Sequence, residues 1–284
     1  MAKQYQSIIR LFEHSGIDTS QEINISRVKK QLAAEFDFSE TGFIEIDGHT
    51  YNKADVLGEL DHPDFAKRLQ YHQRIWNAGY VLAMLENFEF NYLEFREQMK
   101  AFNGDPAFDQ FFSPYFTQSF IYCSRSYLDK AQFEYMGQLL LFEEFILAEN
   151  REEAFAPLRI FLDDNLKVFR NVNRENYPTF KSRLNIWLGS YWSEMFNQLP
   201  PEFYHYKSEF AYFLVNLTVY VQFSHPEDAK AISYELSCMK DIPEELAKTI
   251  RSNHAIYTKK QEGNISWGWV IWIVLILLRL AAGC

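Results

Sequence analysis

The sequence predicts a predominantly α-helical protein with one small β-hairpin near residues 43–51 and a C-terminal transmembrane helix. Three observations predict this fold class. Apolar residues recur at helical spacing through most of the first 260 residues, only one short segment alternates as a strand does, and residues 265–284 are almost continuously apolar. The helical part fits either a solenoid-like stack of helix pairs or an irregular helical bundle.

Four segments carry the helical signal most clearly. Apolar and aromatic residues fall on one helical face over residues 65–83, 133–146 and 180–196. Residues 210–223 are apolar apart from three polar positions, and a segment of this length is too short to cross a bilayer comfortably. We therefore expect residues 210–223 to form a central core helix, with a partial strand as the alternative because of their β-branched content.

Helix starts are marked by capping residues that precede proline. Asp105-Pro106 and Ser113-Pro114 each offer a capping side chain followed by a proline that suits the first helical position. Each pair therefore predicts a helix N-terminus. A strand signal appears only at residues 42–51, where Ile44 and Ile46 alternate with polar residues ahead of Asp47-Gly48. Asp-Gly suits a type I′ turn, so we expect a hairpin there.

Composition limits the classes of function. The 284 residues include 26 Phe, 17 Tyr and 6 Trp, which excludes an intrinsically disordered chain because such side chains gain much from burial. The net charge of −10 makes nucleic acid an unlikely partner, since backbone binders carry a basic face. We expect residues 1–260 to form an acidic, aromatic-rich helical domain in the cytosol, with a softer internal boundary near Gly104.

The C-terminal segment differs in kind from the rest of the chain. Residues 265–284 carry one charged residue in twenty, and a helix of this length spans about 30 Å, the thickness of a hydrocarbon core. Tryptophans cluster at the entry side, where indoles favour the membrane interface. The residues we assign to the membrane anchor are Trp267, Gly268, Trp269, Trp272 and Arg279, with Arg279 reaching the far headgroups.

Flanking charge predicts the orientation of this helix. Lys259 and Lys260 precede the segment, so the positive-inside rule places the bulk of the chain in the cytoplasm, in a tail-anchored layout without a secretory leader. Two alternatives remain open: a hydrophobic helix docked in the protein's own core or in an oligomer interface, and a helix lying on the membrane surface. Lipidation of Cys284 also remains open, although a prenylation box requires a cysteine four residues from the end.

Candidate catalytic groups all have a simpler structural interpretation. His72 falls in line with Leu69 and Trp76, which favours a hydrogen-bonded core histidine over a metal ligand shared with His62. The arginine–histidine pairs, the adjacent acid pairs and the cysteines lack the spacing of catalytic sites. These residues are Arg68 with His72, Arg251 with His254, Glu143-Glu144, Glu152-Glu153, Asp163-Asp164, Cys123 and Cys238. We expect no catalytic residue, cofactor or metal.

Three functions fit this sequence. The first is a non-catalytic binding or adaptor module held at the membrane surface, whose partners are the lipid bilayer and a protein. The second is a membrane-perturbing effector, pore-forming or depolarising, whose C-terminal helix forms homo-oligomers through small residues such as Gly268. The third is an enzyme whose chemistry the sequence does not identify.

Overall fold

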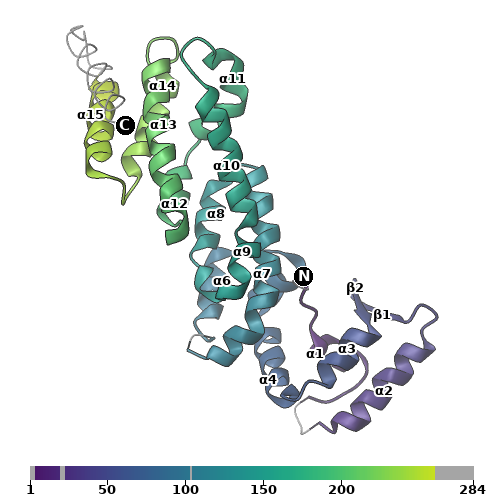
Figure 1. Cartoon of the computed structure of the whole chain (residues 1–284). Helices are drawn as coiled ribbons and strands as arrows, with labels where there is room; N and C mark the ends of the chain where they lie inside the picture. The colour runs from purple at the N-terminus through teal and green to yellow at the C-terminus, as the bar shows by residue number, and fades with distance from the viewer. Residues whose placement is uncertain (1–3, 20–22, 103, 260–284) are drawn as a thin grey trace. The chain divides into compact units, whose positions relative to one another are not determined.

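The computed structural model describes residues 4–19, 23–102 and 104–259 (Figure 1). These residues form fifteen α-helices, four short 3-10 helices and one two-stranded antiparallel sheet, which confirms the predominantly helical fold and its single hairpin. The chain forms two compact units, one ending at Leu162 and the other beginning at Asp163. Helix α10 (Ala156–Asn171) contributes residues to both units.

The first unit contains the hairpin and the longest helix. Its elements are α1 (Ile8–His14), α2 (Ile25–Phe38), β1 (Phe43–Ile46), β2 (His49–Asn52), α3 (Lys53–Leu60), α4 (Phe65–Trp76), α5 (Gly79–Asn87), α6 (Tyr92–Met99), α7 (Pro106–Asp129), α8 (Phe133–Leu140), η1 (Glu143–Phe145), η2 (Ala148–Asn150) and α9 (Arg151–Ala154). The softer boundary expected near Gly104 falls in the short connection between α6 and α7.

The hairpin forms at the predicted place. Phe43 pairs with Asn52 and Ile46 with His49, so a two-residue turn of Asp47 and Gly48 joins the strands. Both turn residues have positive φ, 51° and 81°, as a type I′ turn requires. Asn52 ends β2 and also caps α3, because its side chain accepts hydrogen bonds from the backbone N–H groups of Ala54 and Asp55.

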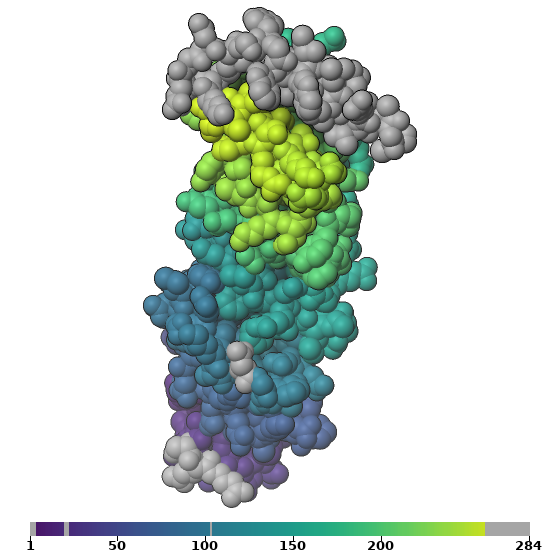
Figure 2. Space-filling model, turned by 90° about the vertical axis from the view of Figure 1, so that its left-hand side faces the viewer, coloured from purple at the N-terminus to yellow at the C-terminus, as the bar shows by residue number. Residues whose placement is uncertain are grey.

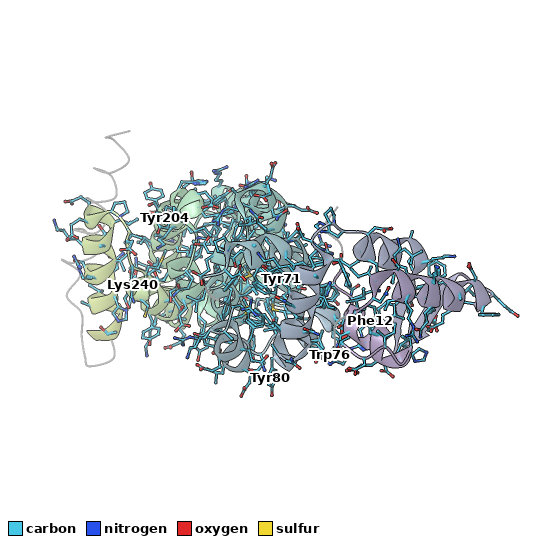
Figure 3. All side chains as sticks on the ribbon, turned by 90° about the horizontal axis from the view of Figure 1, so that it is seen from below. Phe12, Tyr71, Trp76, Tyr80, Tyr204 and Lys240 are labelled. Carbon is cyan, nitrogen blue, oxygen red and sulfur yellow. The ribbon has the colours of Figure 1, made fainter. Side chains whose placement is uncertain are left out.

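The N-terminal helices share one apolar core with the hairpin. Buried side chains from α1, α2, both strands, α3 and α4 form this cluster, which includes Phe12, Leu32 and Tyr51. Trp76 at the end of α4 packs against it, and Figure 3 shows Phe12 and Trp76 close together while half-exposed Tyr80 lies at the edge. This packing fixes α3 and α4 beside the N-terminal segment, which is what assembles the site described below.

Helix α7 starts at one predicted helix N-terminus and runs through the other. Asp105 caps it as predicted, with Pro106 at the first helical position. The second predicted start, at Ser113-Pro114, is wrong because Pro114 lies inside the helix. The hydroxyl of buried Ser113 accepts hydrogen bonds from the backbone N–H of Leu147 at 2.9 Å and from Asn150 Nδ2 at 3.1 Å. The sequence pattern predicted that Ser113 caps a helix, but its side chain instead makes tertiary contacts.

The second unit is built around tryptophan and phenylalanine. Its further elements are α11 (Tyr177–Leu184), η3 (Asn185–Leu188), α12 (Trp192–Asn197), η4 (Pro201–Phe203), α13 (Tyr204–Val221), α14 (Pro226–Cys238) and α15 (Glu244–Lys259). Trp187 and Phe210 lie 5.0 Å apart between ring centroids, and both are fully buried. Helix α14 packs against α13 and α15, and Figure 2 shows α14 and α15 as a continuous surface of light green and yellow.

The predicted core helix at residues 210–223 is confirmed as most of α13, so the partial-strand alternative is wrong. The other three segments are helical but interrupted. The 65–83 segment breaks between Trp76 and Gly79, and residues 133–146 end as a 3-10 turn. Residues 180–196 bend at Tyr191, whose φ is 71°. A helical apolar period identifies which face is buried but does not exclude a bend that preserves that face.

Candidate functional site

The candidate site lies in the first unit and centres on His72. Helix α4 buries His72, which is 2% exposed, on the same face as Leu69. His72 Nδ1 lies 2.8 Å from the Tyr5 hydroxyl, and His72 Nε2 lies 3.2 Å from Glu59 Oε1. The structure therefore confirms the interpretation of His72 as a hydrogen-bonded core histidine, and it identifies both partners.

Glu59 of α3 is held by two residues one helical turn apart on α4. Arg68 donates to both carboxylate oxygens, from Nε at 2.6 Å and from the guanidinium Nη2 at 2.7 Å. Burial opposes ionisation of Glu59, but the hydrogen bonds from His72 and Arg68 outweigh it and lower the pKa of Glu59 to about 2. Glu59 is therefore ionised at neutral pH, and its oxygens only accept hydrogen bonds.

These charges fix the tautomer of His72. Burial lowers the pKa of His72, against the opposing effect of Glu59, so the ring is neutral near pH 7. Because the Glu59 carboxylate can only accept, Nε2 carries the proton and donates it to Glu59. Nδ1 is then an acceptor, and the Tyr5 hydroxyl donates to it. The result is a directed chain of hydrogen bonds from Tyr5 through His72 to Glu59.

A pocket opens beside this chain of hydrogen bonds. It is small, with a volume of about 50 Å³, and it is open to solvent. The lining comes from the N-terminal segment, α1, β2, α3, α4 and α7. The lining residues are Gln4, Gln6, Ile8, Tyr51, Asp55, Val56, Glu59, His72 and Tyr115. Burial and the charge of Glu59 raise the pKa of Tyr115, so its hydroxyl stays protonated.

A buried carboxylate holds the N-terminal segment against this pocket. Glu86 is 3% exposed and accepts from the backbone N–H of Ser7 at 2.8 Å and from Arg10 at 2.7 Å. The side-chain amide of Gln4 donates to the Glu86 carbonyl oxygen at 2.6 Å. Arg10 also lies over the Trp76 ring, 5.4 Å from its centroid. This network explains how residues 4–10, which lack a sheet partner among the described residues, occupy a defined position.

The predicted anchor residues lie outside the described residues, and of the two flanking lysines only Lys259 lies within them. Lys259 is the last residue of α15, and Lys260, Trp267, Gly268, Trp269, Trp272 and Arg279 follow it in the part that the structure does not describe. Within residues 4–19, 23–102 and 104–259, no helix is both long enough and apolar enough to cross a membrane. The anchor therefore stays a prediction.

The other motifs singled out from the sequence do not assemble into a second site. Asp163 accepts from the Tyr206 hydroxyl while Asp164 binds Lys167, so adjacent acids contact different partners. Arg251 binds Glu244, whereas His254 lies 2.9 Å from the Ser233 hydroxyl. Across the described part of the chain, no group of three or more His, Cys, Asp or Glu side chains is placed to hold a metal ion.

Both cysteines of the described residues are free thiols. Cys123 is buried, and its thiol lies 3.4 Å from the Phe88 carbonyl oxygen. Burial raises the pKa of Cys123 to about 12, which keeps the thiol protonated and unreactive. Cys238 is exposed.

Sequence reasoning missed Tyr5, Glu59 and Tyr115. The four-residue spacing of Arg68 and His72 puts them on one face of a helix, and this spacing was the only local signal. Their shared partner comes from another helix, and Tyr5 comes from a segment with no regular structure. Comparison with protein-family models, curated proteins and solved structures finds no match to this chain.

Proposed function

We propose that this protein is a membrane-tethered, non-catalytic binding module whose ligand site is the pocket lined by Glu59, His72 and Tyr115. One observation carries the proposal: most polar side chains of the pocket are fixed in place by hydrogen bonds to other parts of the first unit. A site whose groups are already ordered loses little conformational entropy when a ligand binds.

The chain of hydrogen bonds from Tyr5 to Glu59 supports binding more than catalysis. A hydroxyl, a histidine and a carboxylate in this order can activate a nucleophile. Here the hydroxyl belongs to Tyr5, which is 1% exposed, and burial raises the pKa of Tyr5 well above its ordinary value. A phenol that is buried and firmly protonated is a poor nucleophile. We therefore assign the chain of hydrogen bonds to holding the pocket wall.

The tether is the predicted helix of residues 265–284. Its apolar length matches a bilayer, and Lys259 and Lys260 favour a cytoplasmic location for the rest of the chain. In this proposal the helix acts by location, because confinement near a target raises the effective concentration without adding contacts.

The tether is tested with the full chain and a variant carrying Val274→Asp and Leu277→Asp. The full chain should remain in the membrane pellet after alkaline carbonate extraction. The variant should be released, since each central Asp costs about 3 kcal/mol of insertion free energy. A full chain that is extracted as readily as the variant would show that residues 265–284 are not a span.

Dye-filled vesicles separate the binding module from the membrane-perturbing effector. A binding module should leave the dye inside, and exchange of residues 265–284 for an unrelated anchor should change nothing. An effector should release the dye and should lose this activity on Gly268→Leu, because close helix contact needs a small residue. Dye release that depends on Gly268 would overturn the proposal in favour of the effector.

The pocket is tested in cells by a photo-crosslinking residue at exposed position 4, which lines the pocket. A binding module should yield a crosslinked partner that disappears on Tyr115→Leu. The same crosslinker at exposed position 45, on the hairpin and outside the pocket lining, is the matched control. Equal crosslinking from both positions would mean that the pocket is not the binding site.

A further inference from the structure

We propose that a second site of the first unit, a groove lined by α5, α6 and the connection between them, binds an extended peptide segment of a protein partner that carries a lysine or arginine beside an apolar residue. The groove has a volume of about 700 Å³ and is open to solvent, a size typical of ligand sites. No residue lines both this groove and the pocket beside His72, so the inference goes beyond the proposed function.

Helix α5 contributes a wall of the groove with little side chain on it. Gly79 and Ala83 line the groove and lie four residues apart, and therefore on one face of α5. Gly79 has no positive φ, and a Cβ atom at this position would lie in open space. Neither backbone conformation nor crowding therefore requires a glycine here. The opening permits another chain to approach the helix closely, for which glycine is suited.

Two aromatic side chains also line the groove. Phe90 is held by edge-on contacts with Phe95 and Phe142, with ring centroids 5.5 and 5.9 Å apart. Tyr80 is 42% exposed and lies at the edge of the molecule in Figure 3. An apolar side chain that enters beside these rings is removed from water by a surface that is already partly fixed.

Two side-chain amides of the groove have their NH₂ groups left for a ligand. Gln98 Oε1 accepts from the backbone N–H groups of Tyr80 at 2.9 Å and Val81 at 3.2 Å, so Gln98 caps the start of α5. Asn91 Oδ1 accepts from the backbone N–H of Glu94 and caps α6 in the same way. Both oxygens are thus committed, and neither NH₂ group has an acceptor among the described residues.

These NH₂ groups complement the carbonyl oxygens of a peptide backbone. In a helix those oxygens are bonded to N–H groups of the same chain, whereas an extended segment leaves them free. The remaining side-chain polar groups of the lining are the Tyr80 hydroxyl, which can donate or accept, and the Glu89 carboxylate, which accepts. The lining thus offers donors and acceptors together, as the C=O and N–H groups of an extended chain require.

Charge selects the kind of peptide. Glu89 is the one charged side chain of the lining, it is exposed, and it makes no ion pair with a described residue. Of the two cations of α6, Lys100 binds Glu97 and lies outside the lining. Arg96 also lies outside it and donates to the Tyr92 hydroxyl. A lysine or arginine of the ligand is therefore attracted, while a phosphate, a carboxylate or a nucleic acid is repelled.

The test selects peptides with the full chain in detergent. A library of random heptapeptides displayed on phage is bound to the immobilised chain, after depletion on the Gly79→Leu variant. Leucine is a good helix former, and at position 79 its side chain enters the open space of the groove. We expect the enriched peptides to share a lysine or arginine next to an apolar residue.

One enriched peptide, synthesised with a fluorophore and with blocked ends, is then titrated by fluorescence anisotropy. Gly79→Leu should weaken its binding about tenfold or more, because the new side chain occupies the groove. Gly58→Leu is the matched control, since Gly58 is also an exposed helical glycine in open space and lies outside the groove lining. This control should bind as the unmodified chain does, and both variants should keep its helical dichroism.

Two conservative variants separate charge from hydrogen bonding. Glu89→Gln should weaken binding about fivefold, and this loss should vanish for a peptide whose lysine or arginine is replaced by norleucine. With that neutral peptide, Asn91→Asp should also weaken binding about fivefold. Aspartate keeps the oxygen that caps α6 and loses the NH₂ donor, so the variant reports on the donor. Glu45→Gln, which changes an exposed carboxylate outside the groove lining, should have no effect.

Enrichment of no peptide over the Gly79→Leu chain, or of peptides rich in acidic residues, would overturn the inference. Equal binding by the Gly79→Leu and Gly58→Leu chains, or unchanged binding by both conservative variants, would do so as well. Loss of binding on Tyr115→Leu with retention on Gly79→Leu would place the peptide in the pocket beside His72 and overturn the groove. The position-4 crosslink, dye retention and carbonate extraction do not depend on Gly79, so failure of the inference is distinguishable from failure of the proposed function.

Discussion

His72 Nε2 donates a hydrogen bond to Glu59 Oε1 across 3.2 Å, between two residues that lie on neighbouring helices. Arg68 holds the same carboxylate from one turn earlier on α4. Glu59 therefore joins α3 to α4 and forms part of the pocket wall at the same time. Stability of the first unit and shape of the pocket thus depend on the same ionised group.

Glu59 should make the first unit sensitive to acid. Its pKa is about 2 in the folded chain against an ordinary value of 4.5, so its contribution is present above pH 4.5 and is lost as the pH falls from 4.5 toward 2. The shift corresponds to about 3 kcal/mol. We expect Glu59→Gln to lower the free energy of unfolding by about 3 kcal/mol at neutral pH. The free energy of unfolding of this variant, measured with urea, should also depend less on pH between 4.5 and 2.

His72 should affect the stability of the first unit in a separate and higher pH range than Glu59. Burial lowers its pKa in the folded chain, so the unfolded chain takes up the proton first as the pH falls below 6.5. The stability that neutral His72 contributes is present above pH 6.5 and is lost below it. His72→Phe should remove the pH dependence that begins as the pH falls below 6.5, while the dependence due to Glu59 at lower pH persists. An unchanged profile in that range would show that His72 does not titrate there.

Glu86 and Arg10 should be strongly coupled. Both side chains are largely buried, with 1% and 14% exposure, and their ion pair measures 2.7 Å. Breaking a buried pair by removing one partner costs about 3–5 kcal/mol, because it leaves the other charge uncompensated. Arg10→Met and Glu86→Leu should each destabilise by this amount, and the double variant should lose clearly less than their sum.

The matched control for this cycle is the pair of Lys100 and Glu97. Its members are 59% and 64% exposed and lie three residues apart on the surface. Such exposed pairs contribute little to stability. The Lys100→Met and Glu97→Leu variants should therefore show no measurable coupling. Strong coupling in both cycles would mean that burial is not the cause.

The sequence predicted most of the turns and helix starts that depend on neighbouring residues alone. Asp47-Gly48 marks the hairpin because both residues adopt positive φ, and Asp105-Pro106 marks the start of α7 because both residues suit a helix start without help from distant contacts. Ser113-Pro114 follows the same pattern but misleads. The Ser113 hydroxyl is used by residues that are more than thirty positions away, and such contacts leave no trace in the local sequence.

The site was predictable only in part for the same reason. Helical spacing puts Arg68 and His72 on one face, and the apolar neighbours of His72 indicate that it is buried. Neither signal identifies Glu59 as the shared acceptor or Tyr5 as the second partner of the imidazole. Those contacts depend on how α3 and the N-terminal segment pack against α4, which the core cluster of the first unit decides.

Ser113 should stabilise the turn that follows α8. It is fully buried, and its hydroxyl accepts hydrogen bonds from the Leu147 N–H and from Asn150. Ser113→Ala leaves both donors without this acceptor, which costs about 1–3 kcal/mol. We expect a loss of that size in urea unfolding. Ser126→Ala is the control and should change stability little, because Ser126 is half-buried on the same helix and its hydroxyl accepts from the exposed Lys130.

A glycine at position 131 should stabilise the C-terminus of α7. Ala131 has a φ of 52°, and the hydrogen bonds from Ala131 N–H to Leu128 and from Gln132 N–H to Tyr127 form a Schellman cap. A left-handed non-glycine residue costs about 1–2 kcal/mol, of which the added freedom of glycine in the unfolded chain cancels part. Ala131→Gly should therefore raise the free energy of unfolding by about 0.5–1 kcal/mol.

Phe88 provides the contrasting case, because it occupies the same kind of cap at the end of α5 with a φ of 59°. Its ring stacks on Tyr122 with centroids 4.2 Å apart, a contact that Ala131 does not have. Phe88→Gly relieves similar backbone strain but loses this stacking, so it should lower the free energy of unfolding. Ala131→Gly and Phe88→Gly should therefore change the free energy of unfolding in opposite directions. A change in the same direction would show that the stacking of Phe88 on Tyr122 does not outweigh the backbone strain.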